Sequence, residues 1–190
     1  MKRLAFLTSR FQWQGQASAV RAAAKGFGAD VVDLPVDLPT SEADYRGAIA
    51  KAKGEGADAI MVGDNPDIMT NRALIAGLVA QAGWPAIYPF AEFVEAGGLM
   101  AYSFDLVELF ERAADDIHAI LAGANPGDIP FYQASKFELS LNLKTAKALS
   151  LSVPATCSRR PTRWSNEAAG FFGAVGGAVG PPNHGGSRSP

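Results

Sequence analysis

Short apolar runs alternate with amphipathic segments along residues 1–156, and this pattern restricts the possible folds more than any other feature of the chain. Strand candidates lie at residues 3–7, 30–34, 57–63, 85–88 and 98–102. Helix candidates lie at residues 17–27, 41–56, 70–83 and 105–121. Strands that alternate with helices form right-handed βαβ units around a parallel sheet. The sequence therefore predicts an α/β fold with a doubly wound, mostly parallel sheet.

Residues 105–121 carry the clearest helical pattern. One face is apolar, with residues at helical spacing: Leu106, Leu109, Phe110, Ala113, Ile117 and Ile120. The opposite face carries Glu108, Glu111, Arg112, Asp115 and Asp116. Asp and Ser side chains accept hydrogen bonds from the first amides of a helix. We therefore expect Asp105 to cap this helix, and Asp67 and Ser41 to cap earlier ones.

The pattern changes from Phe131 onward. The run FYQASKFELSLNL alternates apolar and polar residues, which predicts a half-exposed strand, and a short helix follows at 144–149. This segment lies beyond the regular alternation, so we expect it to belong to a different layer or lobe. From Cys157 onward Gly, Pro, Ser and Arg dominate without any period, which predicts that residues 157–190 are disordered.

Composition excludes several classes of protein. The formal net charge of −2 gives no basic surface for nucleic acid or an anionic membrane. Cys157 is the only cysteine, so neither an intrachain disulfide nor a cysteine metal cluster can form. No apolar run approaches the roughly 18 residues of a membrane-spanning helix, so we expect no insertion into a membrane. The apolar stretch in the opening MKRLAFLTSRF is shorter than the apolar region of a signal peptide. We therefore expect the chain as written to lack one.

Polar and aromatic residues cluster where the predicted strands end. Ligands of open α/β sheets bind outside the carboxyl ends of the strands. The residues predicted to line such a site are Ser9, Arg10, Asp64, Asn65, Tyr88, Glu92, Tyr102 and Ser103. Each of them alone is better explained as a loop or cap residue, and only the whole set favours a binding edge. The mixture suits a small polar solute with an apolar body.

Catalytic and metal-binding patterns are missing from the sequence. His118 falls on the helix at 105–121 without a second histidine at metal-ligand spacing, and His184 falls in the predicted tail. The run KGFGAD follows a helix and leads into a strand, which reverses the dinucleotide-binding order. The sequence therefore predicts a protein that is not an enzyme and that needs no cofactor or metal.

Two alternative functions fit the same fold. A flavodoxin-like or receiver-type signalling domain would use Asp64 as its phosphoacceptor. That chemistry requires an acidic pair after the first strand and a basic residue after the fifth, and these positions hold Thr8-Ser9-Arg10 and Tyr102-Ser103 instead. An enzyme acting on sugars or nucleotides is the other alternative, and the missing phosphate loop argues against it.

The second half of the chain resembles a known bacterial family. Its landmarks are FVEAGGLM at 93–100, PGDIP at 126–130, KFEL at 136–139 and NLKTAKAL at 142–149. Together they resemble ABC-transporter substrate-binding proteins of the type related to tryptophan- and tyrosine-binding lipoproteins. The resemblance covers about residues 3–156 and is stronger from Pro85 onward. It implies a solute-binding protein that works with an ABC permease, in the periplasm or as a membrane-anchored lipoprotein.

Members of that family have two lobes that close over the solute. The resemblance therefore implies that residues 1–123 form the second lobe and that residues 124–156 return toward a first lobe, which the chain lacks. On this interpretation the strand and helix within 131–149 complete that first lobe. Half of a cleft supplies half of the contacts, so we expect weak binding of a solute, for example an amino acid. Arg10 or amides at a helix start would hold its carboxylate, and Asp64 would meet its amine.

The tail departs from the family. Family members end, after Val-Pro and a few residues, in a sequence such as Leu-Leu-Ala-Pro-Ala-Asp-Glu-Val-Val-Glu. A DNA sequence that encodes this ending, translated one base later, reads Cys-Ser-Arg-Arg-Pro-Thr-Arg-Trp-Ser-Asn, which matches residues 157–166. We therefore expect that a one-base frameshift after Thr156 created residues 157–190, and that Cys157 and the nearby arginines carry no evolved function.

Overall fold

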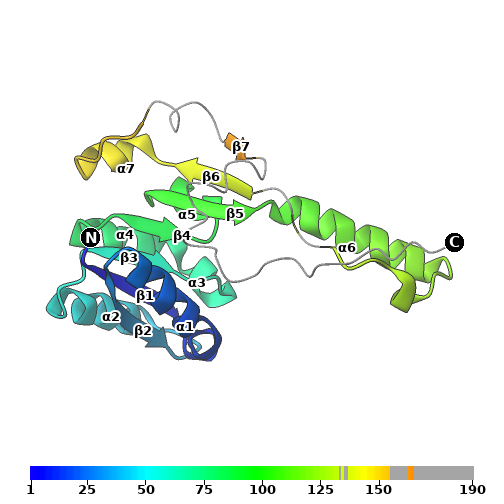
Figure 1. Ribbon diagram of the computed structural model, residues 1–190, viewed down its shortest axis with the longest axis horizontal. Coiled ribbons are helices and arrows are strands. Elements are labelled where there is room, and N and C mark those ends of the chain that lie inside the picture. The colour runs from blue at the N-terminus through cyan, green and yellow to red at the C-terminus, as the bar shows by residue number, and fades with distance from the viewer. Residues whose placement is uncertain (133, 135–136, 155–161, 165–190) are drawn as a thin grey trace, which may run out of the picture.

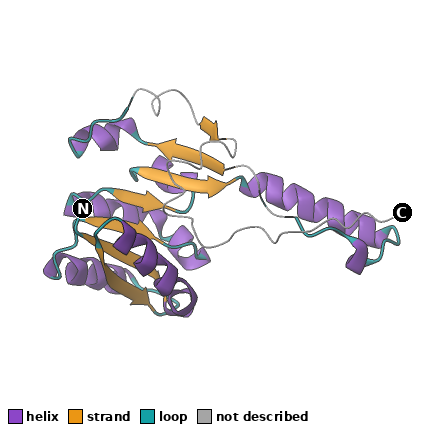
Figure 2. Ribbon diagram, in the orientation of Figure 1, coloured by secondary structure: helices purple, strands orange, loops and turns teal. Residues whose placement is uncertain are grey.

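A computed structural model describes residues 1–132, 134, 137–154 and 162–164 of the 190-residue chain. Its centre is a seven-stranded sheet with the order β2-β1-β3-β4-β5-β6-β7 (Figures 1 and 2). The strands are β1 (Arg3–Ser9), β2 (Asp30–Val36), β3 (Ala59–Val62), β4 (Ala86–Tyr88), β5 (Met100–Phe104), β6 (Phe137–Leu141) and β7 (Thr162–Trp164). Neighbouring strands from β2 to β5 are parallel, whereas β6 and β7 are antiparallel additions. The predicted fold class, a mostly parallel α/β sheet, is confirmed.

Helices cover both faces of the parallel strands. They are α1 (Arg10–Gly26), α2 (Glu42–Gly54), α3 (Pro66–Thr70), α4 (Arg72–Ala82), α5 (Ala91–Glu95), α6 (Leu106–Leu121), η1 (Pro126–Asp128) and α7 (Leu143–Ala148). The main apolar core lies between the sheet and α2, α4 and α5, where Leu7, Ile60 and Phe93 are almost completely buried. The other face is covered by α1, which buries Ala17 and Ala24. The strands read as apolar runs because they are buried on both faces.

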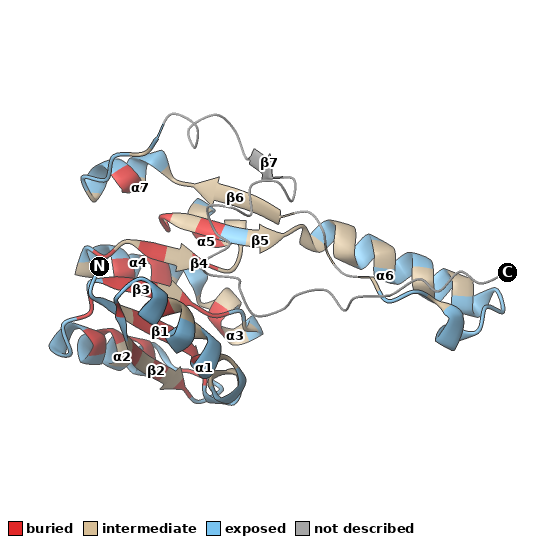
Figure 3. Ribbon diagram, viewed as in Figure 1, coloured by how far each residue is buried: buried red, intermediate tan, exposed pale blue. Residues whose placement is uncertain are grey.

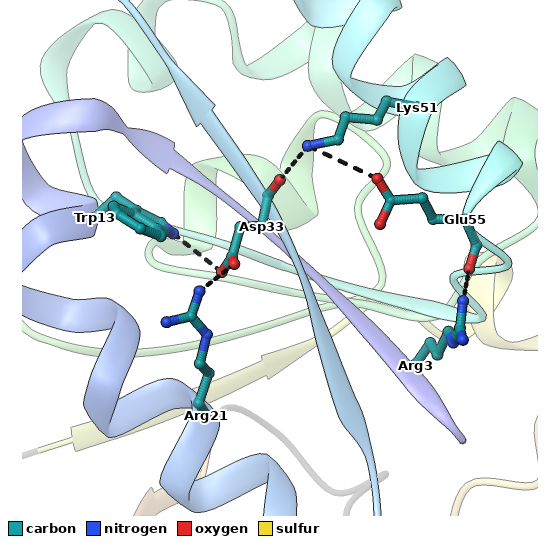
Figure 4. A network of polar contacts seen from close by, with 6 residues as sticks. All are labelled: Arg3, Trp13, Arg21, Asp33, Lys51 and Glu55. Atoms are coloured by element: carbon teal, nitrogen blue, oxygen red, sulfur yellow. Dashed lines mark hydrogen bonds and ion pairs between the residues drawn. The ribbon is translucent and has the colours of Figure 1, made fainter.

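A polar network fastens α1 and α2 to the edge strand β2 (Figure 4). The Asp33 carboxylate accepts hydrogen bonds from the indole Nε1–H of Trp13 at 3.0 Å and from the Arg21 guanidinium. The Arg21 guanidinium also lies over the Trp13 ring, 5.4 Å from its centroid. On the other side of the strand, Lys51 donates to the backbone carbonyl of Asp33 at 2.9 Å. Both helices are thus held to one residue of β2.

Two predicted boundaries on the helices are wrong. The first helix begins at Arg10 instead of residue 17, because Ser9 ends β1 and caps α1 by accepting from the amide of Gln12. The predicted helix at 70–83 is divided into α3 and α4. Asn65 caps α3 by accepting from the amide of Asp67 at 2.8 Å, so Asp67 itself is not the cap. By contrast, the predicted caps Ser41 and Asp105 are confirmed.

The structure places the strand and helix within 131–149 beside the parallel strands, and their assignment to a first lobe stays a prediction. Strand β6 pairs antiparallel with β5 in the main sheet, because β5 otherwise leaves a row of backbone groups unpaired. Helix α7 then packs beside α5, where Thr145 donates to the carbonyl of Gly97 at 2.9 Å and Ala146 is buried. An alternating sequence indicates a strand without indicating its partner, so the pattern alone left this pairing open.

Most of the predicted tail lies outside the described residues. Within 157–190 the structure describes only β7, a three-residue strand that pairs with the free edge of β6. At these three residues the structure differs from the predicted irregular chain, because an edge strand accepts any backbone that can pair with it. The frameshift and the remaining residues of the tail stay predictions.

Helix α6 projects away from the sheet (Figure 1). It covers the predicted residues, and the Asp105 carboxylate accepts from the amides of Val107 and Glu108 at 2.9 and 3.2 Å. None of its residues is buried, and Figure 3 shows exposed and half-buried residues along its whole length. The predicted amphipathic helix is therefore present, but its apolar face is not part of the core.

Candidate functional site

The candidate site is the edge of the sheet at which β1, β3, β4 and β5 all end. These strands are parallel, so their carboxyl ends meet at one edge, and all eight predicted residues lie at or near it. Helices α1, α3 and α5 each begin within a few residues of the strand that precedes them. The edge therefore combines short loops, side chains and the positive ends of helices.

Gln12 joins two of the strand ends, and sequence reasoning did not identify it. Its side-chain oxygen accepts from the Ser9 hydroxyl at 3.0 Å and lies 3.4 Å from the Asn65 amide nitrogen. Its amide nitrogen donates to the backbone carbonyl of Asp64 and lies 3.5 Å from the Asp64 carboxylate. Three predicted residues thus meet at one unpredicted amide. The available signal was the position of Gln12, in the first turn of a helix that directly follows a strand.

Close contact between β1 and β3 requires a glycine at this edge. A Cβ atom placed on Gly63 would lie 2.5 Å from the Thr8 hydroxyl oxygen, so any larger residue would push the two strand ends apart. Ser9 is nearly inaccessible and acts as a helix cap, as does Asn65 for α3. The exposed carboxylate of Asp64 is consequently the part of this cluster that solvent reaches most freely.

Arg10 lies at the start of α1 and is already paired. Its guanidinium binds the Asp37 carboxylate with two hydrogen bonds, of 2.6 Å from Nε and 2.9 Å from Nη2. The hydrogen bond from Arg10 holds the pKa of Asp37 below its ordinary value, and the same contact raises the pKa of Arg10. Both side chains are exposed, so the pair is screened by water and open to exchange. A ligand carboxylate that used Arg10 would have to compete with Asp37.

Tyr88 belongs to the core instead of the exposed edge. Only 2% of the residue is accessible, and its ring stacks on Phe93 with centroids 4.9 Å apart. Burial raises the pKa of its hydroxyl. A Cβ atom on Gly98 would lie 2.6 Å from this ring, so Gly98 is the residue that leaves room for it. Tyr88 is thus a core residue beneath the strand-end edge and packs against α5 through Phe93.

The other predicted residues are accessible and border an aromatic pair. Glu92 lies in the first turn of α5, and Ser103 lies near the end of β5. Tyr102 is 38% exposed and stacks on Phe137, with ring centroids 5.5 Å apart. Phe90 and Phe104 follow β4 and end β5, and their rings meet edge to face at 6.4 Å. The edge therefore has a polar half over β1 and β3 and an aromatic half over β4 and β5.

A buried tyrosine holds the loop after β3 in place. The Tyr45 side chain is completely buried, and its hydroxyl donates to the Asp67 carboxylate at 2.7 Å. Burial, followed by the hydrogen bond to Asp67, raises the pKa of this hydroxyl. The Asn71 side chain donates to the carbonyl of Asp67 at 2.9 Å. Helix α2 thereby supports the turn that presents Asp64 and Asn65.

Within the described residues, no group of three or more His, Cys, Asp or Glu side chains is placed to hold a metal ion. The helices of that part of the chain are all too short or too polar to span a membrane. The edge offers hydrogen-bonding groups, accessible carboxylates and aromatic rings.

The chain forms an open, mostly parallel sheet with a mixed polar and aromatic edge at its strand ends. The family model for ABC transporter substrate binding proteins matches residues 5–164. The chain therefore belongs to the ABC transporter substrate-binding protein family. No curated protein is found to match it.

Solved structures share the fold at low sequence identity. A conserved domain protein from Vibrio cholerae O1 biovar El Tor is 20% identical, with a TM-score of 0.72, over 85% of this chain and 54% of its own. An ABC domain from Streptococcus pneumoniae in complex with L-Trp is 23% identical, with a TM-score of 0.71, over 83% and 54%. A ligand-free, open substrate binding protein from Clostridium difficile is 19% identical, with a TM-score of 0.59, over 81% and 52%. The chain thus spans about half the length of these proteins.

Proposed function

We propose that this chain is a solute-binding component of an ABC importer and binds a small organic solute, such as an amino acid, without catalysis. The observation that carries the proposal is the family match over residues 5–164, together with the edge where Gln12 joins Ser9, Asp64 and Asn65. By this proposal the protein acts outside the cytoplasmic membrane, in the periplasm or as a lipoprotein, and delivers its solute to an ABC permease.

The two halves of the edge suggest how such a solute is held. The exposed Asp64 carboxylate would meet an amino group, and the first amides of α1, with Arg10, would meet a carboxylate. The aromatic half around Phe90 and Phe104 would take the apolar body of the solute. Support also comes from the Streptococcus pneumoniae neighbour, whose complex contains L-Trp, a molecule with those three groups.

Binding by this chain should be weak. The proposed solute lies in a cleft between two lobes, and the chain spans about half the length of its structural neighbours. One lobe supplies only part of the contacts that bury a ligand. We therefore expect dissociation constants on the order of millimolar rather than micromolar.

A titration followed by two-dimensional ¹H–¹⁵N NMR tests the proposal on the full chain. L-Trp, other L-amino acids and related carboxylates are added, and we expect concentration-dependent shifts that concentrate at the amides of residues 9–12 and 64–65. Asp64→Asn should weaken the response to amino acids about tenfold, because it removes a charge-assisted contact. The control Asp115→Asn changes an exposed carboxylate on α6 and should leave the response unchanged.

Each outcome has a separate meaning. A response spread evenly over the molecule, or none for any compound, would refute solute binding at this edge. If Asp64→Asn leaves the response unchanged, the proposed role of Asp64 is refuted, while solute binding at this edge is not. Micromolar affinity would contradict the expectation that the cleft is half formed.

A further inference from the structure

The ion pair between Arg10 and Asp37 lies at the same edge as the candidate site and extends that edge by one strand. Strands β1 and β2 are parallel neighbours, and their last residues, Ser9 and Val36, pair with each other. Arg10 and Asp37 are the next residues along the chain. The pair therefore joins the carboxyl ends of β1 and β2, beside the polar groups that Gln12 connects.

The geometry of this pair is the one in which a guanidinium binds the carboxylate of a ligand. Two nitrogens of Arg10 donate to the two carboxylate oxygens of Asp37, at 2.6 Å and 2.9 Å. The Thr40 hydroxyl donates to the backbone carbonyl of Asp37 at 3.0 Å, which supports the turn after β2. Asp37 thus occupies, from within the chain, the donors that a solute carboxylate needs.

The charges at this part of the edge favour an amine over a carboxylate. The ends of β1, β2 and β3 carry the guanidinium of Arg10 and the exposed carboxylates of Asp37 and Asp64. Two carboxylates and one guanidinium leave one negative charge. Complementary charge is a main source of specificity in recognition. While Arg10 is paired, a solute carboxylate meets this negative charge without a free guanidinium to offset it.

We propose that Asp37 is a specificity-determining residue of this edge, which disfavours carboxylate-bearing solutes by occupying Arg10. The inference rests on the proposed function, because it requires that the solute binds here. The side chains of Arg10 and Asp37 are 54% and 73% exposed, so water screens the pair and a ligand can displace Asp37. Removal of such a competitor should strengthen carboxylate binding about two- to fivefold.

Three probes with the same indole ring separate the two charged groups of a solute. Indole-3-propionate carries only the carboxylate, tryptamine carries only the amine, and L-Trp carries both. Each is added to the full-length chain, and its affinity is measured from the ¹H–¹⁵N NMR shifts of the amides of residues 9–12. Asp37→Asn keeps the size of the side chain and removes its charge. It should strengthen binding of indole-3-propionate and L-Trp about two- to fivefold and should not strengthen binding of tryptamine.

Two matched controls identify the cause of any gain. Asp30→Asn makes the same change of charge at an exposed residue at the opposite end of β2, and it should leave all three affinities unchanged. Asp37→Asn is also made in an Arg10→Gln background. There it should give no gain, because no guanidinium remains to be released. This background separates the release of Arg10 from a simple loss of repulsion.

The outcomes distinguish the inference from the proposed function. Three results would overturn the inference alone: an Asp37→Asn variant that binds indole-3-propionate no better than wild type, a gain that persists in the Arg10→Gln background, or an equal gain for tryptamine. If neither wild type nor Asp37→Asn responds to any probe at these amides, the proposed function fails and the inference fails with it. A response of Asp37→Asn where wild type gives none would support both.

Discussion

The hydrogen bond from Tyr45 to Asp67 should contribute measurably to stability. Tyr45→Phe removes a buried hydroxyl that lies 2.7 Å from a carboxylate oxygen and keeps the ring that fills the core. Hydrogen bonds to charged groups contribute about 1.5–3 kcal/mol. Since about 1 kcal/mol shifts the melting temperature of a protein of this size by 2–4 °C, we expect Tyr45→Phe to melt about 3–12 °C lower.

Tyr88→Phe is the matched control for this measurement. Tyr88 is equally buried in the core, yet none of the described residues forms a hydrogen bond with its hydroxyl, so its loss should cost under about 0.5 kcal/mol. Both variants would be compared by thermal unfolding followed by circular dichroism at 222 nm. Equal midpoints for Tyr45→Phe and wild type, or a larger loss for Tyr88→Phe, would show that the Asp67 contact does not support the loop.

Two further predictions concern packing and pH. Gly98→Ala should lower the free energy of unfolding by about 1–3 kcal/mol, because its Cβ atom would meet the Tyr88 ring at 2.6 Å. The control Gly47→Ala, in open space on α2, should raise it by about 0.5–1 kcal/mol, and the reverse order in urea unfolding would contradict this. Arg10 lowers the pKa of Asp37, so that pair stabilises the fold above pH of about 4 and is lost as pH falls through the lowered pKa. Asp37→Asn should therefore be less stable than wild type at pH 7 and equal to it near pH 2; an equal difference at both pH values would refute the contribution.

Part of the polar cluster at the strand ends could be predicted from the sequence. The rule that strand ends line a site selected Ser9, Asp64 and Asn65, and these three do meet. Tyr88 follows the same rule, but its ring turns into the core to stack on Phe93. Gln12 was missed because the predicted first helix began at residue 17, so Gln12 was not placed in the first turn after β1, and its contact with a loop 52 residues away is not visible in the sequence.

What the sequence by itself determined is local. The caps at Ser41 and Asp105, the five parallel strands, and the apolar stripe of α6 all depend on groups within a few residues of each other. These features can therefore be predicted from short segments of the sequence alone.

Tertiary structure decided which distant groups became partners. It paired β6 with β5, joined Arg10 to Asp37, and kept every residue of α6 out of the core, although the sequence of α6 is typical of a buried helix. An exposed backbone edge or an apolar face can be satisfied by any suitable partner that comes near. Which partner each group meets depends on how the folded chain brings distant segments together, and the residue pattern along the chain does not specify this.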